Sequence, residues 1–326
     1  MVAKRSFATT ALPVDEQTTD ADAAMRVMTV TGLHTYPIKS CAAVDLMEAR
    51  VTPRGLELDR DFMVVDDEND FVSQRKVPEL ALVVPTIAVG SISLPAPGME
   101  AALVPLDRDA DVGEPVTATV HGRSVAARVV AEDLNEWFTT FLASHKSNRR
   151  FRLLRVCDDI PGHVKDRYKR HGASNQVGFA DGSAILLATE PSLAQLNAQL
   201  EEPVPMERFR PNIVVQGIGL APYDEDFWSH IQIGALEAFA VKACDRCVIT
   251  DTDQRTAAVG KAVRMALRTR RGVNAHDHSN KGVFFAQNLN HVYAPGTVIR
   301  VGDAVRVIAR SSKPNVVLAT RGLKAL

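Results

Sequence analysis

The sequence predicts a mostly β protein of the α+β class, with two domains and a few helices. The chain has 326 residues, whereas a domain usually holds about 100–200 residues. Runs of β-branched residues, punctuated by Pro and Gly, succeed one another through the first half at the close spacing of a barrel or sandwich. Further strand-like runs make up much of the second half.

Residues 1–27 are expected to form a disordered leader. Lys, Arg, Ser and Thr open the chain in MVAKRSFATTALP, as they do in an organellar presequence. Acidic residues follow at Asp15, Glu16, Asp20 and Asp22, however, and transit peptides contain few acids. We therefore favour a disordered leader and a cytoplasmic protein over organellar targeting.

The first domain is predicted over residues 28–150. Its first strand lies in VMTVTGLHTYPIKS, where β-branched residues occur in alternation and a turn marked by Pro follows. Later strands are expected in ELDRDFMVVDD, NDFVSQRK, VVPTIAV, SISLPAPG, VTATVHG and SVAARVV. A helix follows in LNEWFTTFLASH, with Asp133 as its N-cap and a buried face of Leu134, Trp137, Phe138, Phe141 and Leu142.

The second domain is predicted over residues 151–326. We interpret the basic segment KSNRRFR, residues 146–152, as a solvated link between the two domains. The strand SAILLA then leads into the helix TEPSLAQLNAQL, with Thr189 as its cap and a buried stripe of Leu193, Leu196 and Leu200. The remaining strands are expected in RFRPNIVVQG, IQIGALEAFAVKA and GTVIRVGDAVRVI.

The composition narrows the classes of partner and location. The net charge is -1, so the chain lacks the basic excess that binding to nucleic acid requires. No apolar run approaches the roughly 20 residues of a transmembrane helix, and we expect no transmembrane segment. Four cysteines do not make a disulfide framework in a chain of this length, which favours a reducing compartment.

The cysteine pair in ACDRCVIT allows several kinds of chemistry. A redox dithiol should lie where a strand meets a helix, but Cys244 and Cys247 stand between LEAFAVKA and CVIT, which both read as strands. A zinc ribbon needs a second pair, and Cys41 and Cys157 are single. A single reactive thiolate beside Arg246, or a structural cysteine, remains.

Other polar residues give weaker signals when they are considered singly. His276, Asp277 and His278 are metal-ligand types without a third ligand nearby, so a solvated loop is favoured. Neither a G-x-G-x-x-G fingerprint nor a phosphate-loop lysine motif occurs in the sequence. Several cations and hydroxyls fall at strand ends, where each alone is expected to be a surface group: Lys39, Ser40, Arg60 and Arg210.

Ordered motifs resemble a known family. FADGSAILLATEPSLAQLN, RFRPNIVV, APYDEDFW, IQIG and ACDRCVIT are similar to the MOSC domain, the C-terminal module of molybdenum cofactor sulfurases. TYPIKSC, LDRDFMVVD and SQRK resemble the β-barrel domain that precedes it in the mitochondrial amidoxime-reducing components and their bacterial relatives. The resemblance covers residues 30–308 and implies an N-terminal MOSC-type β-barrel domain followed by a MOSC β-barrel domain.

The resemblance also implies a molybdenum cofactor site. The second cysteine of A-C-x-R-C is the family's molybdenum ligand, which matches Cys247, and Cys244 is then only a neighbour. A soft thiolate suits a metal that the pterin already holds by sulfur. The pterin phosphate needs cations and hydrogen-bond donors. The family's ligands there match Lys39, Ser40, Arg60, Ser183, Arg210 and Asn212.

The sequence departs from the family pattern near two further site residues, Asp245 and Phe284, and their assignment to the cofactor site is weaker than that of the others. Asp245 stands where the animal proteins often have Ser, and it is expected to tune the cofactor or bind substrate. Phe284 falls near a position that is Tyr in the animal proteins. The following loop, usually D-P-D-T-G, reads DTDQRTA here. These differences concern substrate preference and loop geometry, and they remove no expected ligand.

The activity implied by the resemblance is reduction of N-hydroxylated compounds, such as amidoximes and hydroxylamines, by a molybdenum-dependent oxidoreductase. Its electrons are expected from an external donor, namely a cytochrome b5-type protein, a flavoprotein reductase or a ferredoxin, since the sequence has no dinucleotide fingerprint or ferredoxin-type cysteine set. The alternative is a carrier of the molybdenum cofactor, or of sulfur on Cys247, without reductase activity. A scaffold without cofactor is the third possibility.

Overall fold

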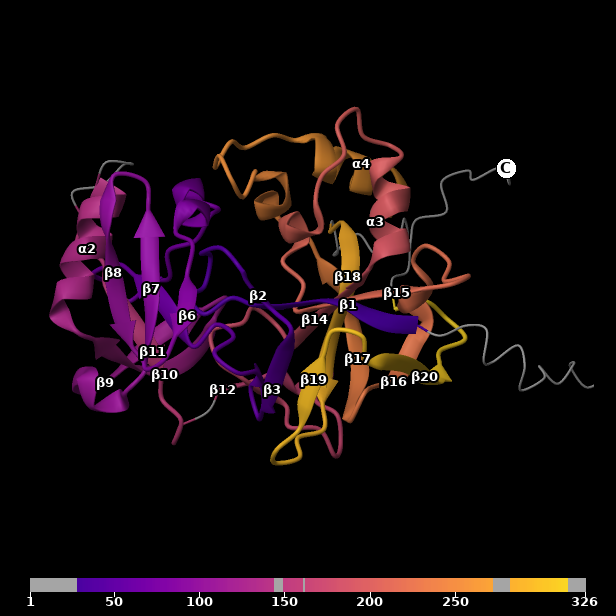
Figure 1. Cartoon of the computed structure of the whole chain (residues 1–326), viewed down its shortest axis with the longest axis horizontal. Helices are drawn as coiled ribbons and strands as arrows, with labels where there is room; N and C mark the ends of the chain where they lie inside the picture. The colour runs from indigo at the N-terminus through magenta and orange to yellow at the C-terminus, as the bar shows by residue number, and fades with distance from the viewer. Residues whose placement is uncertain (1–27, 144–148, 161, 272–281, 316–326) are drawn as a thin grey trace, which may run out of the picture.

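The computed structural model describes residues 28–143, 149–160, 162–271 and 282–315 (Figure 1). This part of the chain is mostly strands and includes three α-helices, labelled α2 (Glu132–Ala143), α3 (Glu190–Asn197) and α4 (Ala262–Arg271). The predicted fold class is thereby confirmed. The expected His276-Asp277-His278 loop and the expected leader lie outside the described residues.

A closed barrel forms one unit of the molecule, on the right in Figure 1. Its strands follow the order β15-β14-β18-β17-β16-β20-β1, and β1 pairs again with β15, which closes a barrel of seven strands. Alternate residues point inward and form a core that includes Leu33, Ile213 and Trp228. The barrel strands are β1 (Met28–Thr35), β14 (Ile185–Thr189), β15 (Ile213–Gly217), β16 (Trp228–Ile233), β17 (Leu236–Asp245), β18 (Phe284–His291) and β20 (Ala304–Arg310).

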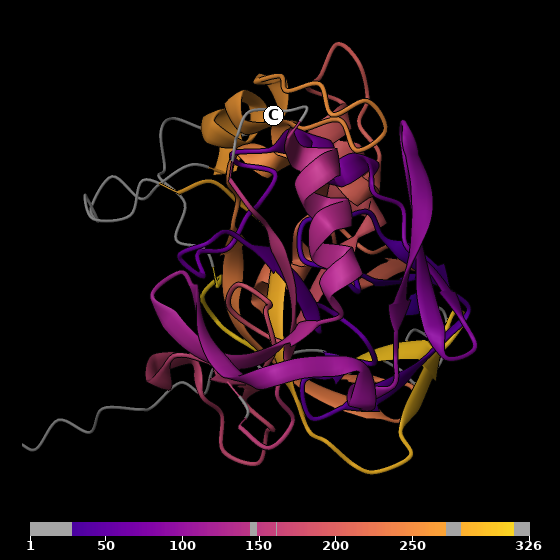
Figure 2. The ribbon, with the colours of Figure 1, turned by 90° about the vertical axis from the view of Figure 1, so that its left-hand side faces the viewer.

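The other unit contains separate small sheets and helix α2, which faces the viewer in Figure 2. Phe62, Phe138 and Leu153 belong to its main apolar core, which packs α2 against β11 and β8. Its strands are β5 (Phe62–Val65), β6 (Thr86–Ala88), β7 (Ser91–Ala96), β8 (Met99–Pro105), β9 (Asp111–Val120), β10 (Arg123–Val130) and β11 (Arg152–Val156). Short strands elsewhere are β2 (Val44–Leu46), β3 (Glu48–Thr52), β4 (Gly55–Leu56), β12 (Gly162–His163), β13 (Gln176–Val177) and β19 (Val298–Arg300).

Each unit contains a strand from the other side of the predicted domain boundary at residue 150. Strand β1 comes first in the described chain, yet it lies among the barrel strands between β15 and β20 (Figure 1). Strand β11 comes after the boundary, yet it pairs with β5 and β10. Part of the expected link, at Phe151 and Arg152, is therefore core and strand instead of a solvated connection. Because the chain passes from the barrel to the other unit after β1, the turn that follows β1 lies between the two units.

The two helix caps differ from those expected. Helix α2 begins at Glu132, so Asp133 lies within its first turn and accepts a hydrogen bond from the Leu134 N–H at 3.0 Å. Thr189 occupies the N-cap position of α3 but makes no capping hydrogen bond. Its hydroxyl instead donates to Glu225 Oε2 at 3.0 Å, because this buried carboxyl group needs donors.

The stability of the protein is expected to depend on pH through Glu225. Burial raises the pKa of Glu225 to about 7, although Ser192 and Thr189 donate hydrogen bonds to it. A raised carboxyl pKa stabilises the fold below the unfolded value of 4.5, and this contribution is lost as pH rises through about 7. The loss is on the order of 3 kcal/mol. Glu225→Gln should flatten this part of the pH profile in urea titrations at pH 4.5 to 8; profiles that superimpose would contradict the assignment.

No helix among the described residues is long and apolar enough to cross a membrane.

Candidate active site

A cavity of about 120 Å³ lies between the two units and brings together almost all the expected site residues. Its wall includes side chains of the turn after β1, of β17 and of the segment between β14 and β15. Phe284 is the exception: it is the first residue of β18, where the pairing register with β17 slips, and it does not line the cavity. The expected residues that do line it are Lys39, Ser40, Arg60, Ser183, Arg210, Asn212, Asp245 and Cys247.

Lys39 and Ser40 are buried, contrary to the expectation that each alone is a surface group. The Lys39 ammonium donates to the Phe179 carbonyl at 2.9 Å and forms an ion pair with Asp181. Burial lowers the pKa of Lys39, and Asp181 opposes this effect. Ser40 adopts a left-handed backbone with φ of 74°. The turn after β1 thus presents a cation and a hydroxyl to the cavity.

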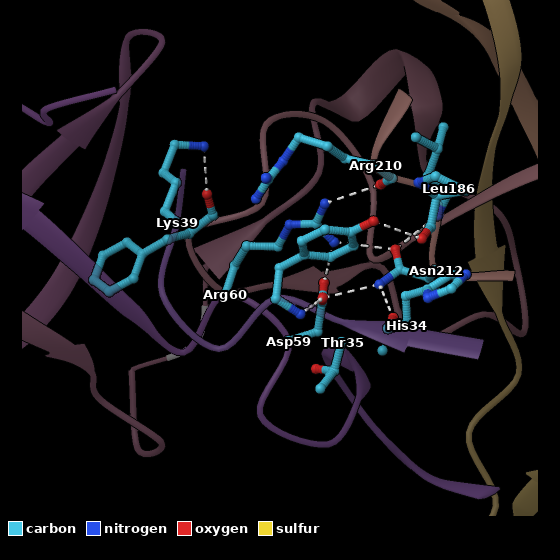
Figure 3. A network of polar contacts seen from close by, with 12 residues as sticks. His34, Thr35, Lys39, Asp59, Arg60, Leu186, Arg210 and Asn212 are labelled. Carbon is cyan, nitrogen blue, oxygen red and sulfur yellow. Dashed lines mark hydrogen bonds and ion pairs between the residues drawn. The ribbon is translucent and has the colours of Figure 1, made fainter. Parts of the chain in front are cut away.

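Arg60 belongs to a polar network that also supports the fold (Figure 3). Its guanidinium donates to Asp59 Oδ2 at 2.5 Å and to Asn212 Oδ1 at 3.1 Å. Asp59 is almost fully buried and accepts further hydrogen bonds from the Tyr36 N–H and Asn212 Nδ2. Asn212 also donates to the His34 carbonyl at 3.1 Å. Arg60 and Asn212 therefore hold the units together as well as lining the cavity.

Arg210 is a buried cation of a different kind. Its guanidinium lies 4.3 Å from the centre of the Tyr36 ring, and Arg60 contacts the same ring at 4.3 Å. Within the described parts of the chain, Arg210 forms no ion pair with a carboxylate. Burial lowers its pKa to about 10. A buried cation that lacks a carboxylate partner favours an anionic ligand in the cavity that it lines.

The cysteine pair stands where a strand meets a short helix. Strand β17 ends at Asp245, and Cys247 is the N-cap of a 3₁₀ helix at Val248–Asp251. The expected strand in CVIT is therefore wrong, and the placement argument against a dithiol no longer holds. Both thiols are free and line the cavity. Arg246 donates to the Cys244 sulfur at 2.9 Å, so the two thiols have different neighbours.

Two residues at the cavity, Arg75 and Asp181, were missed when residues were considered singly. Arg75 lines the cavity together with Cys247, and its guanidinium lies 3.6 Å from Asp181. Burial would lower the pKa of Arg75, but Cys247, Asp181 and Asp245 raise it above its ordinary value. Burial would also raise the pKa of Asp181, but Lys39 and His121 hold it well below the usual range. Only their motifs, SQRK and FADGS, gave a signal in the sequence.

Unsatisfied donors and the kinds of side chain present fit a molybdenum cofactor. Ser183 Oγ and Asn288 Nδ2 are buried and have no hydrogen-bond partner within the described residues, and both side chains line the cavity. Buried polar atoms of this kind normally have a partner. A thiol, several cations and free hydrogen-bond donors together match a ligand that carries a soft metal and an anionic phosphate.

Curated proteins resemble the chain over most of its length. Mitochondrial amidoxime-reducing component 1 of Homo sapiens is 31% identical over 297 residues, which cover 87% of this chain and 84% of that protein. The Mus musculus and Xenopus laevis proteins of the same name are 32% and 30% identical, over 84% and 85% of their lengths. This chain belongs to the family of mitochondrial amidoxime-reducing components.

Two domain families match successive parts of the chain. The MOSC N-terminal beta barrel domain matches residues 27–145, and the MOSC domain matches residues 174–306. The relatives are named as mitochondrial, which does not favour the expected cytoplasmic location. A solved Bordetella bronchiseptica protein is 22% identical over 34% of this chain, with a TM-score of only 0.26.

Proposed function

We propose that the protein is a molybdenum-cofactor-dependent reductase of N-hydroxylated compounds such as amidoximes and hydroxylamines. The observation that carries the proposal is the cavity between the two units, where a free thiol, buried cations and unpartnered donors lie together. The names of the family members support the class of substrate. Their identity to this chain, near 30%, leaves its particular substrate to experiment.

In this proposal the residues of the cavity divide into two groups. Cys247 is the metal ligand, and Arg75 is a neighbouring cation in the same cavity wall. The phosphate of the pterin lies where hydrogen-bond donors and cations are concentrated. These residues are Lys39, Ser40, Arg60, Ser183, Arg210 and Asn212. When bound, the molybdenum cofactor supplies the two electrons for N–O bond cleavage, which with two protons converts an N-hydroxyl group to N–H and water.

Asp245 is the proposed substrate contact. Its side chain is exposed and lines the same cavity as Cys247. Oδ1 accepts a hydrogen bond from the Val283 N–H at 3.2 Å, which fixes the carboxylate at the end of β17. A fixed carboxylate two residues before the metal ligand is available to accept a hydrogen bond from the N–OH or amine group of a substrate.

Metal and pterin analysis tests the proposal most simply. Protein made in a host that synthesises the molybdenum cofactor should contain about one molybdenum and one pterin per chain. The oxidised, fluorescent pterin released by acid reports the second quantity. Absence of stoichiometric molybdenum and pterin from folded protein would remove the proposed function.

The purified protein is expected to need a separate electron donor. NADH and an amidoxime should give essentially no turnover. The electrons of a nicotinamide pass to a metal through a flavin or a comparable group, which a separate protein is expected to supply. Addition of a cytochrome b5-type protein with its flavoprotein reductase, or of a reduced ferredoxin, should start the reaction. Amidine formation measured by chromatography checks this, and brisk turnover with NADH alone would contradict it.

A further inference from the structure

A pair of buried glutamine side chains connects the two units beside the cavity. Gln74 lies in the turn between β5 and a 3₁₀ helix at Pro78–Leu82, and Gln254 lies in the loop that follows the helix begun by Cys247. Gln74 Nε2 donates to Gln254 Oε1 at 2.9 Å, and Gln254 Nε2 donates to Gln74 Oε1 at 3.0 Å. Both side chains are buried, so the reciprocal amide pair is shielded from water.

The outer hydrogen bonds of the amide pair reach the cofactor site on both sides. Gln74 Nε2 also donates to the Ser40 carbonyl at 2.7 Å, and Gln254 Oε1 accepts from Arg210 Nη1 at 3.3 Å. Gln254 Nε2 donates further to the Thr252 carbonyl at 3.1 Å. Both amide hydrogens and both acceptor positions of Gln254 are thus in use, which fixes the direction of its amide.

The loop that carries Gln254 is itself held firmly. Asp253 accepts hydrogen bonds from the backbone N–H groups of Arg255 and Thr256 at 3.0 Å, and its other oxygen pairs with Arg208 at 2.7 Å. A bridge between Thr252 and Val259 closes the loop. Gln254 therefore approaches Arg210 and Gln74 from a fixed backbone.

A second cavity, of about 740 Å³, lies behind the amide pair. Arg210 lines both cavities, Gln254 lines only the second, and Ser40 lines only the cofactor cavity. The amide pair and Arg210 accordingly stand between the two spaces. Loss of the pair would remove the acceptor that Gln254 Oε1 offers to Arg210 Nη1 and free the guanidinium to change rotamer.

We propose that the Gln74–Gln254 amide pair is a positioning element that holds Arg210 and the turn at Ser40 in place for the cofactor, and so slows cofactor loss. This inference rests on the proposed function. The pair joins the first unit to the loop that begins at the metal ligand, so retention of the cofactor becomes coupled to closure of the two units. Neither glutamine lines the cofactor cavity, and each acts through its neighbours.

Gln254→Met and Gln74→Met test the proposal, because Met preserves the length of the side chain but cannot form the amide pair. Holoprotein is diluted, and loss of molybdenum and pterin is followed with time. Each variant should lose them about tenfold faster than the parent, the effect of one or two buried neutral hydrogen bonds. Gln199→Met is the matched control, because within the described residues Gln199 Nε2 donates only to the exposed Gln195 carbonyl, and it should behave like the parent.

A double variant separates positioning from general loosening of the fold. Gln254→Met should accelerate loss less in an Arg210→Ala background than it does alone, because only its effect through Gln74 on the turn at Ser40 remains, whereas a merely structural effect would add in full. Should Gln254→Met fail to fold, Gln74→Met breaks the same pair from the other unit. Loss rates within twofold of the parent, or additive effects in the double variant, would overturn the inference. A parent protein without cofactor would instead refute the proposed function.

Discussion

Replacement of Cys247 by Ser is expected to abolish molybdenum coordination and N-reduction while the fold remains. A serine hydroxyl is a hard and mostly protonated ligand, so it cannot replace a thiolate on this metal. Activity should fall by at least a thousandfold, an amount typical for the loss of a group on which the chemistry depends. Metal analysis, circular dichroism and dye-driven amidoxime reduction measure the three properties.

Cys244→Ser is the matched control for that substitution. Cys244 lines the same cavity, but its sulfur accepts a hydrogen bond from Arg246 at 2.9 Å, whereas Cys247 has Arg75 as a neighbouring cation in the cavity wall. A serine hydroxyl can replace the cysteine sulfur as the acceptor of this hydrogen bond from a guanidinium. Most of the molybdenum and activity should therefore remain. Equal losses in the two variants would indicate a dithiol that acts as a unit.

Arg60→Ala is expected to destabilise the protein by about 3 kcal/mol, because the substitution leaves the buried Asp59 carboxylate without its cation. It also removes the hydrogen bonds to Asn212 Oδ1 and the Arg210 carbonyl. The polar network in Figure 3 indicates that the cofactor-free protein requires this residue as well. Urea unfolding of cofactor-free protein measures the change.

Arg210→Ala provides the comparison. Arg210 contacts the Tyr36 ring and Gln254 but forms no carboxylate ion pair within the described residues, so its loss should cost only about 1 kcal/mol. Cofactor retention should nevertheless fall strongly, because the buried cation faces the phosphate end of the proposed site. If both variants unfold at the same urea concentration as the parent, the structural role assigned to Arg60 is wrong.

The sequence predicted local elements better than their partners. Alternation of β-branched residues located β1, but it could not reveal that β1 closes a barrel with β15, far along the chain. Val248, Ile249 and Thr250 suit a strand by propensity, yet they form a 3₁₀ helix because the chain turns after Cys247 to line the cavity. Tertiary contacts decided both outcomes.

The candidate site was predictable only through the order of its motifs. Lys39 resembles any charged residue at a strand end, and its burial depends on Asp181 and Phe179 in a distant segment. The roles of Arg75 and Gln254 likewise arise from contacts between the two units. Phe284 was predicted from its place in the family pattern, but the slipped register at the end of β17 keeps it out of the cavity wall.

Turnover driven by a chemical reductant tests the central claim most directly, because it separates an enzyme from a carrier of the same cofactor. A low-potential dye such as reduced viologen replaces the natural donor, and several amidoximes and hydroxylamines are offered to preparations that differ in molybdenum content. We predict that the rate of amidine or amine formation rises in proportion to molybdenum. Molybdenum-loaded protein whose centre is demonstrably reduced, but which leaves all these compounds unchanged, would contradict the reductase and favour the carrier.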